Sequence, residues 1–164
     1  MGARGARVPE QRRPSRTGAL QSRLRGTASS HAAWPAQYPG TTRIDPARAV
    51  KAFHRPAAGN DQPLPSDVRP PPVLHSTLDY LFHTLLPTLP LATTHPFIRD
   101  RTRSIRQDFT VQNVRGRSAI ECNERIARYH ILAVGTLREQ SGFSESQELE
   151  QLRKGAAAAL SLVH

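Results

Sequence analysis

Cysteine is nearly absent from this chain. Its 164 residues include a single cysteine, Cys122, so no disulfide can form within the chain and thiolates cannot build a zinc site. The seven histidines are scattered, and none stands four residues from another as in the helical zinc motif. We therefore expect no metal ion and no cofactor, and a reducing compartment suits the chain.

Long apolar runs are missing as well. No stretch approaches the ~18 consecutive apolar residues that cross a membrane, and no apolar signal-peptide segment follows the N-terminal arginines. Hydrophobic residues make up 37% of the chain and aromatic residues 5%, which is little material for a large core. We expect one domain at most, no membrane partner, and a part of the chain that stays unfolded.

Acidic residues are few, and the net charge is +10. Residues 1–30 hold seven arginines and one acid among Ala, Gly, Ser and Pro, and such a segment cannot bury enough apolar surface to offset its ordering entropy. We interpret residues 1–42 as a disordered basic tail; a mitochondrial transit peptide is the alternative, although prolines and glycines interrupt its helix. The arginines that could contact nucleic-acid phosphates are Arg4, Arg7, Arg12, Arg13, Arg16, Arg23 and Arg25.

A short segment, residues 43–72, separates the tail from the helical part. Asp45 followed by Pro46 has the pattern of a helix cap and first helical residue, which predicts a short helix from Ala47 to Phe53. Six prolines between residues 55 and 72 then favour an extended linker. We expect this linker to strap the short helix onto the helices that follow.

Residues 73–164 carry amphipathic periodicity, which predicts an all-α fold. Apolar residues at helical spacing predict a helix from Val73 to about Leu86, where prolines end it. Capping-box patterns at Ser118 and Ser144 predict two later helices, the first running to about Glu139. The last helix would present the apolar residues Leu149, Leu152, Leu160 and Val163. We expect an antiparallel helical array.

Residues 97–112 predict the central helix, with Pro96 at its first position. Its buried face would consist of Phe97, Ile98, Ile105 and Phe109. Three arginines lie on the opposite side at the spacing of a solvated stripe: Arg99, Arg103 and Arg106.

Polar side chains also fall on the buried faces of two predicted helices. Burying an unpaired charge costs several kcal/mol, so these residues require partners. We interpret them as a structural network in which Arg101 and Asp108 pair with each other or with the 118–139 helix. They are accompanied by no nucleophile, by no pair of groups at the spacing for acid–base catalysis and by no cluster of metal ligands. We therefore expect no enzyme and no small-molecule substrate. The network residues are Arg101, Asp108, Gln112, Asn123 and His130.

The stretch from Phe97 to Gln112, FIRDRTRSIRQDFTVQ, closely resembles the signature helix of the germinal-centre-associated nuclear protein (GANP) family, whose fungal members are known as leucine permease transcriptional regulators. The resemblance extends over residues 43–154, including LPSDVRPPPVL at 64–74 and ERIARYHI at 124–131. It implies the start of a PCI-type helical-repeat domain. After Lys154 the run GAAAA departs from the family pattern, so we expect the chain to be a truncated part of that domain.

The resemblance also implies a function. It indicates a non-enzymatic scaffold subunit of the nuclear complex that couples transcription to mRNA export at the nuclear pore. The implied partners are a PCI-domain subunit and a small acidic subunit. Two alternatives remain open: a splicing-linked nuclear paralogue with the same signature, and a basic module that binds RNA through its tail.

Overall fold

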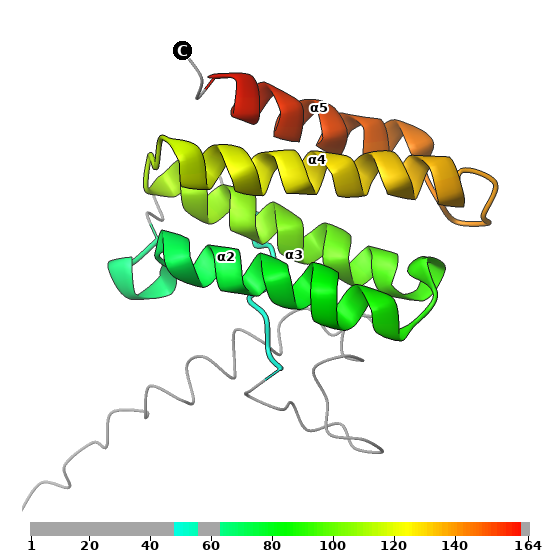
Figure 1. Ribbon diagram of the computed structural model, residues 1–164, viewed down its shortest axis with the longest axis horizontal. Coiled ribbons are helices and arrows are strands. Elements are labelled where there is room, and N and C mark those ends of the chain that lie inside the picture. Colours follow the sequence, from blue (N-terminus) through cyan, green and yellow to red (C-terminus); the bar gives the residue numbers. More distant parts are fainter. Residues whose placement is uncertain (1–47, 56–62, 162–164) are drawn as a thin grey trace, which may run out of the picture.

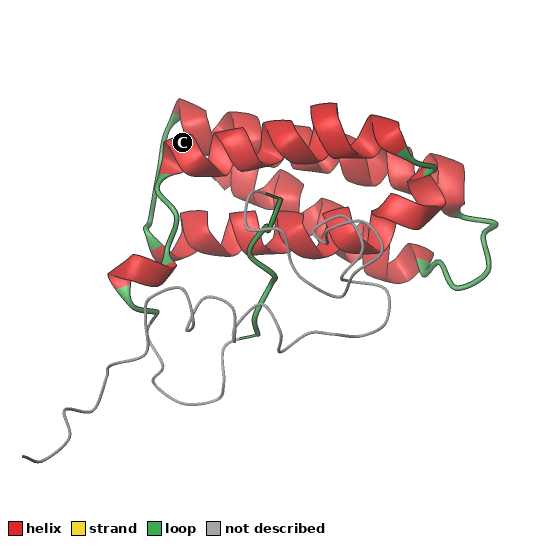
Figure 2. Ribbon diagram, turned by 90° about the horizontal axis from the view of Figure 1, so that it is seen from below, coloured by secondary structure: helices red, strands yellow, loops and turns green. Residues whose placement is uncertain are grey.

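The computed structural model describes residues 48–55 and 63–161 (Figure 1). This part contains four α-helices, α2 (Pro71–Asp79), α3 (Leu91–Val111), α4 (Arg117–Leu137) and α5 (Glu145–Ser161), and no strand. Figure 2 shows the same part as helices joined by loops. The prediction of an all-α fold is confirmed, while the predicted basic tail, residues 1–42, lies outside the described residues.

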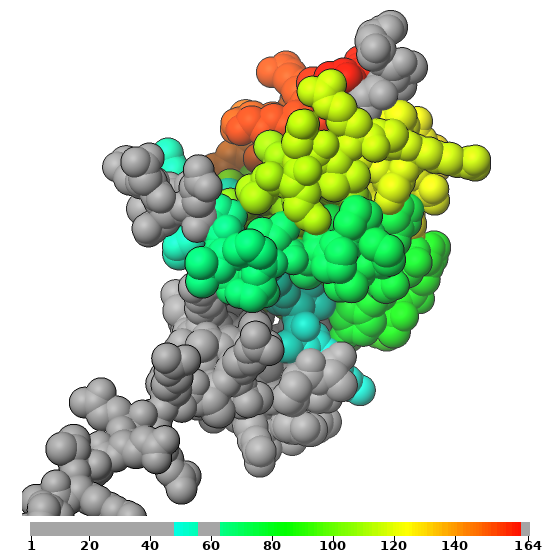
Figure 3. Space-filling view, turned by 90° about the vertical axis from the view of Figure 1, so that its left-hand side faces the viewer, coloured from blue at the N-terminus to red at the C-terminus, as the bar shows by residue number. Residues whose placement is uncertain are grey.

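The helices run antiparallel to their neighbours in the chain (Figure 1). Helix α4 lies along α5 on one side and contacts both α2 and α3 on the other. The space-filling view shows α2, α4 and α5 stacked on one face of the molecule (Figure 3). The main core forms where α2, α3 and α4 meet, and Leu74, Leu78, Ile98, Ile105 and Ile126 are fully buried in it. The predicted buried face of the signature stretch is buried as expected: Phe97, Ile98, Ile105 and Phe109.

The first predicted helix continues beyond α2 in a different form. After Asp79 the chain makes a π-helical turn, Tyr80–Leu85, and then a 3-10 turn, Leu86–Thr88. Leu81 and Leu85 are buried in the π-helical turn, so the predicted apolar stripe keeps its contacts. A second 3-10 turn, Pro65–Asp67, precedes α2.

Helix α3 begins at Leu91, about one and a half turns before the predicted start. Pro90 is its N-cap, and Pro96 lies inside the helix, where it cannot donate to the carbonyl of Ala92. The predicted first position was wrong because Pro90 already occupies the boundary. Burial of Thr94 and His95, which are 1% and 7% exposed, stabilises the turn that Pro96 weakens.

Residues 48–55, which we call the strap, form no helix, so the helix predicted from Ala47 to Phe53 is wrong over its described part. The strap lies against α3 instead, and α3 supplies the hydrogen bonds that a helix would have made internally. Phe53 donates its backbone N–H to Asp100, and the carbonyl of His54 accepts from Gln107. Val50 enters the core at 7% exposure.

Helix α4 has a glycine cap. Gly116 adopts φ 108°, a conformation that favours glycine, and no side chain caps the helix. The predicted capping bond of Ser118 is therefore wrong, because the cap is Gly116 and Ser118 stands two residues later, inside the helix. Helix α5 starts at Glu145, directly after Ser144, as predicted.

The predicted apolar face of α5 is not its buried face. Leu149 and Leu152 are half-buried and Leu160 is 66% exposed, while Val163 lies outside the described residues. The fully buried residues of α5 are Glu148, Gln151 and Gly155.

Gly155 packs against α4, and alanine fits in its place. A Cβ atom there would lie 3.8 Å from the carbonyl oxygen of Asn123 and 4.0 Å from Cβ of Ala127, which are ordinary contacts. Gly155→Ala should raise the free energy of unfolding by about 0.5–1 kcal/mol, because glycine loses more backbone entropy in a helix. Chemical denaturation measures this change. A lower stability of the variant would mean that α4 and α5 approach more closely than these distances state.

Candidate functional site

A buried carboxylate joins the last three helices. Glu148 of α5 is 1% exposed, and three cationic or titratable side chains surround it. Arg99 Nε donates at 2.9 Å, His130 Nδ1 lies 2.5 Å away, and His95 Nε2 lies 3.5 Å away. We call these residues, with Tyr129, the Glu148 cluster. It ties α5 to α3 and α4.

The protonation of the Glu148 cluster follows from its contacts. The hydroxyl of Tyr129 lies 2.8 Å from Nδ1 of His95, and burial raises the pKa of Tyr129 far above its usual value, so this hydroxyl stays protonated. Burial lowers the pKa of His130, against the hydrogen bond to Glu148, so the ring is neutral and donates through Nδ1. Burial alone would raise the pKa of Glu148, but hydrogen bonds from His130 and His95 outweigh it and hold that pKa well below its usual range.

Stability should fall on acidification for two reasons. Between the lowered pKa of His130 and the unfolded value of ~6.5, the unfolded chain binds the extra proton, so stability decreases as pH drops below ~6.5. The lowered pKa of Glu148 adds a further loss below ~4.3, its unfolded value. Each group can contribute up to ~1.4 kcal/mol per pH unit.

Urea denaturation between pH 7 and pH 3 measures this effect. His130→Asn keeps a side-chain N–H for Glu148 but cannot titrate, so it should flatten the upper part of the decline. An unchanged slope in that variant would show that another histidine is responsible.

A second buried carboxylate, Asp108 of α3, binds the segments that precede α2. Lys51 Nζ lies 2.6 Å from Oδ1, and Arg69 Nε lies 2.7 Å from Oδ2. Arg69 also donates to the hydroxyl of Ser104 at 2.9 Å, and its carbonyl accepts from Gln112 at 2.8 Å. Asp108 therefore fixes both the strap and the residues before α2 onto one face of α3.

The structure divides the five predicted network residues among several clusters, and only Asp108 and Gln112 share one, through Arg69. Arg101 pairs with its neighbour Asp100, and its guanidinium lies 4.4 Å from the ring centroid of Phe97. The predicted pairing of Arg101 with Asp108 or with α4 is wrong, because Asp108 pairs with Lys51 of the strap and with Arg69 instead. Asn123 donates to the carbonyl of Ala119, and His130 belongs to the Glu148 cluster.

The solvated stripe predicted on α3 is wrong too. Arg99 binds Glu148, and Arg106 Nη2 donates to Gln151 Oε1 at 2.5 Å. The guanidinium of Arg103 lies 4.0 Å from the ring centroid of Phe53. Helix α5 and the strap therefore cover the side of α3 that the sequence assigned to water.

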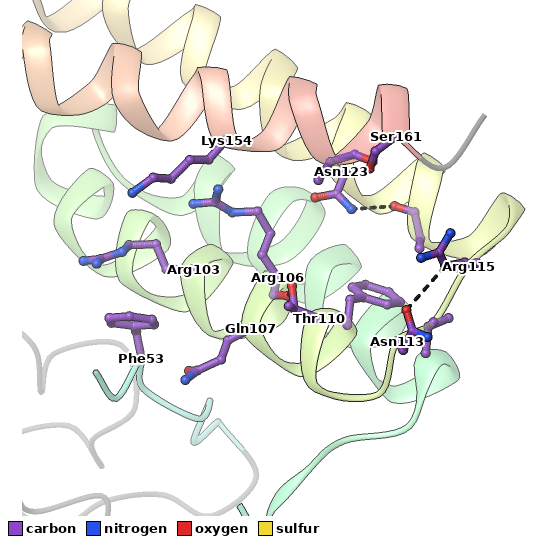
Figure 4. A pocket seen from close by; sticks show the side chains of 14 residues that line it. Phe53, Arg103, Arg106, Gln107, Thr110, Asn113, Arg115, Asn123, Lys154 and Ser161 are labelled. Atoms are coloured by element: carbon purple, nitrogen blue, oxygen red, sulfur yellow. Dashed lines mark hydrogen bonds between the residues drawn. The ribbon is translucent and has the colours of Figure 1, made fainter. Parts of the chain in front are cut away.

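A groove of about 460 Å³ opens between α3, the start of α4 and the second half of α5 (Figure 4). Its charged lining is basic and comes from Arg103, Arg106, Arg115 and Lys154. Val114 and Ala158, both half-buried, contribute apolar surface. We call this the basic groove.

The described residues contain no group of three His, Cys, Asp or Glu side chains suited to a metal ion. In the same part of the chain, no helix is long and apolar enough to span a membrane. Cys122 is fully buried, and burial raises the pKa of its thiol to about 11. This thiol is therefore protonated at neutral pH and unsuited to act as a nucleophile.

Comparison with known proteins settles the family. The model of the SAC3/GANP family matches residues 21–163. The chain belongs to this family. SAC3 family protein 1 of Schizosaccharomyces pombe is 62% identical over 124 residues, which are 74% of this chain and 12% of that protein. The SAC3/GANP resemblance of the signature stretch is thereby confirmed.

Two more distant SAC3/GANP relatives come from an animal and a plant. Protein xmas of Drosophila melanogaster is 33% identical over 116 residues, 65% of this chain and 6% of that protein. SAC3 family protein B of Arabidopsis thaliana is 34% identical over 98 residues, 53% of this chain and 6% of that protein. The chain thus spans a small fraction of the length of these relatives.

Sequence reasoning missed Glu148 as the centre of the site in this SAC3/GANP chain. A signal was present, because residues 148, 151 and 155 share one helical face of α5 and carry Glu, Gln and Gly. A polar stripe of this kind looks solvated unless the facing helices supply partners. Those partners, Arg99 and His130, stand on α3 and α4.

Proposed function

We propose that the chain is a non-enzymatic scaffold segment of the nuclear machinery that couples transcription to mRNA export. Its membership of the SAC3/GANP family suggests a role related to mRNA export. The scaffold role rests on one observation: the buried charges connect separate segments of the fold. Both buried carboxylates, Glu148 and Asp108, hold cationic side chains from other segments and so join elements of the fold.

The proposal includes where and with what the chain works. We place it in the nucleus, associated with the nuclear pore, as part of a PCI-type helical array formed by residues 73–164. Residues 43–72, which include the strap, would fasten the N-terminal segment to this array, and residues 1–42 would form a basic tail. The proposed partners are a PCI-domain subunit and a small acidic subunit of the export complex.

Depletion of the protein in the cells that express it tests this function. Polyadenylated RNA should accumulate in the nucleus within one cell cycle, and a fluorescently tagged copy should concentrate at the nuclear rim. Reintroducing the wild-type chain should restore export, whereas Glu148→Ala, which disrupts the Glu148 cluster, should not. Normal cytoplasmic levels of polyadenylated RNA after depletion would contradict the proposal.

The charge distribution favours a second activity, weak binding of RNA through the tail. Residues 1–30 hold seven arginines and one acid, and each neutralised phosphate adds ~0.7 to the log–log salt slope on single strands. Deleting residues 1–40 should remove most of that slope in a filter-binding or anisotropy titration with a uridine oligonucleotide. An unchanged slope would move the contact surface to the helices.

A further inference from the structure

The basic groove carries positive charge that its own walls do not neutralise. Of the described residues that line it, four are cationic and none is an aspartate or glutamate. Among the described residues, only Lys154 of these four forms an ion pair, with Glu150 at 2.5 Å. Such a concentration of one sign of charge in a recess attracts an anionic group.

Arg106 is the most buried of these cations and has no counter-ion. Its guanidinium donates only to the neutral amide and backbone carbonyl of Gln151, and no described carboxylate lies within ion-pair distance. Its Nε is buried without a hydrogen-bond partner in the described part of the chain. Burial, together with Arg103 and Arg99, lowers its pKa to about 10, so the group stays charged at neutral pH. Buried charges are normally paired, so this donor is available for a ligand.

Asn123 supplies an unused acceptor in the same groove. Its side chain is buried, the residue being 3% exposed, and Nδ2 donates to the carbonyl of Ala119 at 2.9 Å. A carbonyl can only accept, so the amide orientation is fixed, and Oδ1 is the atom that no described residue hydrogen-bonds. Figure 4 shows the side-chain oxygen of Asn123 on the side opposite its dashed hydrogen bond, toward the Arg106 side chain.

We propose that the basic groove docks an extended acidic peptide segment of a partner protein. A backbone N–H of the peptide would donate to Asn123 Oδ1, and a peptide carbonyl would accept from Arg106 Nε. Its carboxylates would pair with the guanidinium groups of Arg103, Arg106 and Arg115, which suit carboxylates because they bind them in a bidentate manner. This inference rests on the proposed scaffold function and deepens it, since it names the kind of segment the scaffold holds.

The groove suits a peptide better than a nucleic acid. Unspecific recognition of single strands relies on aromatic rings on which bases stack. Phe109 is 4% exposed, and the ring of Phe53 already lies under the guanidinium of Arg103. The lining therefore leaves little ring surface for stacking, whereas its apolar part, with Val114 and Ala158, accepts an aliphatic side chain. Its volume of about 460 Å³ lies within the ~300–1,000 Å³ of ligand sites.

The chain's own N-terminal tail is the wrong occupant. Its seven arginines against one acid in residues 1–30 would add positive charge to a groove that already has an excess. An acidic segment of a partner protein has the complementary charge.

Fluorescence anisotropy with the full 164-residue chain tests the proposal. The probe is a fluorescein-labelled peptide in which glutamates alternate with leucine and glycine, and its control carries glutamine for glutamate. Arg106→Gln should weaken binding about 10-fold or more, since hydrogen bonds to charged groups contribute ~1.5–3 kcal/mol. Asn123→Ala, which leaves the charge unchanged, should weaken it about 3- to 10-fold.

Matched variants separate the groove from general charge effects. Arg128→Gln removes the same charge from an exposed position on α4 outside the groove and should change Kd less than about 2-fold. If Arg106→Gln unfolds, Arg103→Gln provides a second test of the groove at a half-buried position. Thermal unfolding of each variant checks its fold.

Three results would overturn the proposal. The glutamine peptide could bind as tightly as the glutamate peptide, or Arg106→Gln and Arg103→Gln could behave like Arg128→Gln. A uridine oligonucleotide could compete with the peptide in a manner that requires Asn123, which would make the groove a nucleic-acid site. If the peptide fails to bind but depletion of the protein retains RNA in the nucleus, only the groove proposal is wrong. If the peptide binds but depletion causes no nuclear retention of RNA, only the scaffold function is wrong.

Discussion

Replacing Glu148 with alanine should lower the free energy of unfolding by about 3–5 kcal/mol, the usual cost of breaking a buried ion pair from one side. Arg99 would lose its carboxylate at 2.9 Å, and the buried Nδ1–H of His130 would be left without its acceptor. Because the free energy of unfolding of a typical domain is only ~5–15 kcal/mol, the variant should unfold at a much lower denaturant concentration. Equilibrium denaturation followed by circular dichroism at neutral pH measures the shift.

Glu150→Ala is the matched control. It removes the same charge from the same helix two residues later, and its side chain is 56% exposed, with only Lys154 as its partner. The denaturation midpoint of this variant should stay nearly unchanged. Equal shifts for the two variants would show that the Glu148 cluster contributes no more than a surface pair.

Replacing Asp108 with alanine should cost a similar ~3–5 kcal/mol, because it leaves two cationic side chains near the core of α3 without a counter-charge. Lys51 and Arg69 both approach Asp108 within 2.7 Å, and Arg69 is 16% exposed at its side chain. The loss should also reduce cooperativity, since the strap depends on this contact. Denaturation of the variant and limited proteolysis of residues 48–55 would measure both effects.

Asp79→Ala gives the comparison for Asp108. Asp79 also pairs with an arginine, Arg125, at 2.6 Å, but its side chain is 55% exposed. An exposed pair of this kind contributes about 0–1 kcal/mol. If Asp79→Ala destabilised the chain as much as Asp108→Ala, burial of the carboxylate would not be the cause.

The sequence predicted the elements whose apolar spacing is continuous. Leu74, Leu78 and Leu81 recur at helical spacing, and Ile98, Ile105 and Phe109 do so on α3, so both helices and their core faces could be assigned. Burial of Arg101 and Asp108 also followed, because these residues share a face with the isoleucines. Such inferences need only the geometry of one helix.

The partners of these residues could not be predicted in the same way. Arg99 and Arg106 look solvated on α3 alone, and they are covered because α5 places Glu148 and Gln151 against them. Whether a polar residue faces water or another helix depends on the packing register of two helices distant in the chain. The helix predicted from Ala47 failed for a related reason: contacts with Asp100 and Asp108 override the local preference of the strap.

The attachment of the strap has a consequence for local motion. Lys51, Phe53 and His54 bind α3 through side-chain contacts that can separate while every helical hydrogen bond remains intact. Native-state hydrogen exchange should therefore find the amides of residues 48–55 opening as a unit, at a free energy well below that of global unfolding. Phe53 forms part of the groove lining through its contact with Arg103, so opening of the strap also removes one wall of the groove. Binding of a peptide and closure of the strap are then thermodynamically linked, and a bound peptide should slow the exchange of these amides by the same factor by which closure tightens binding.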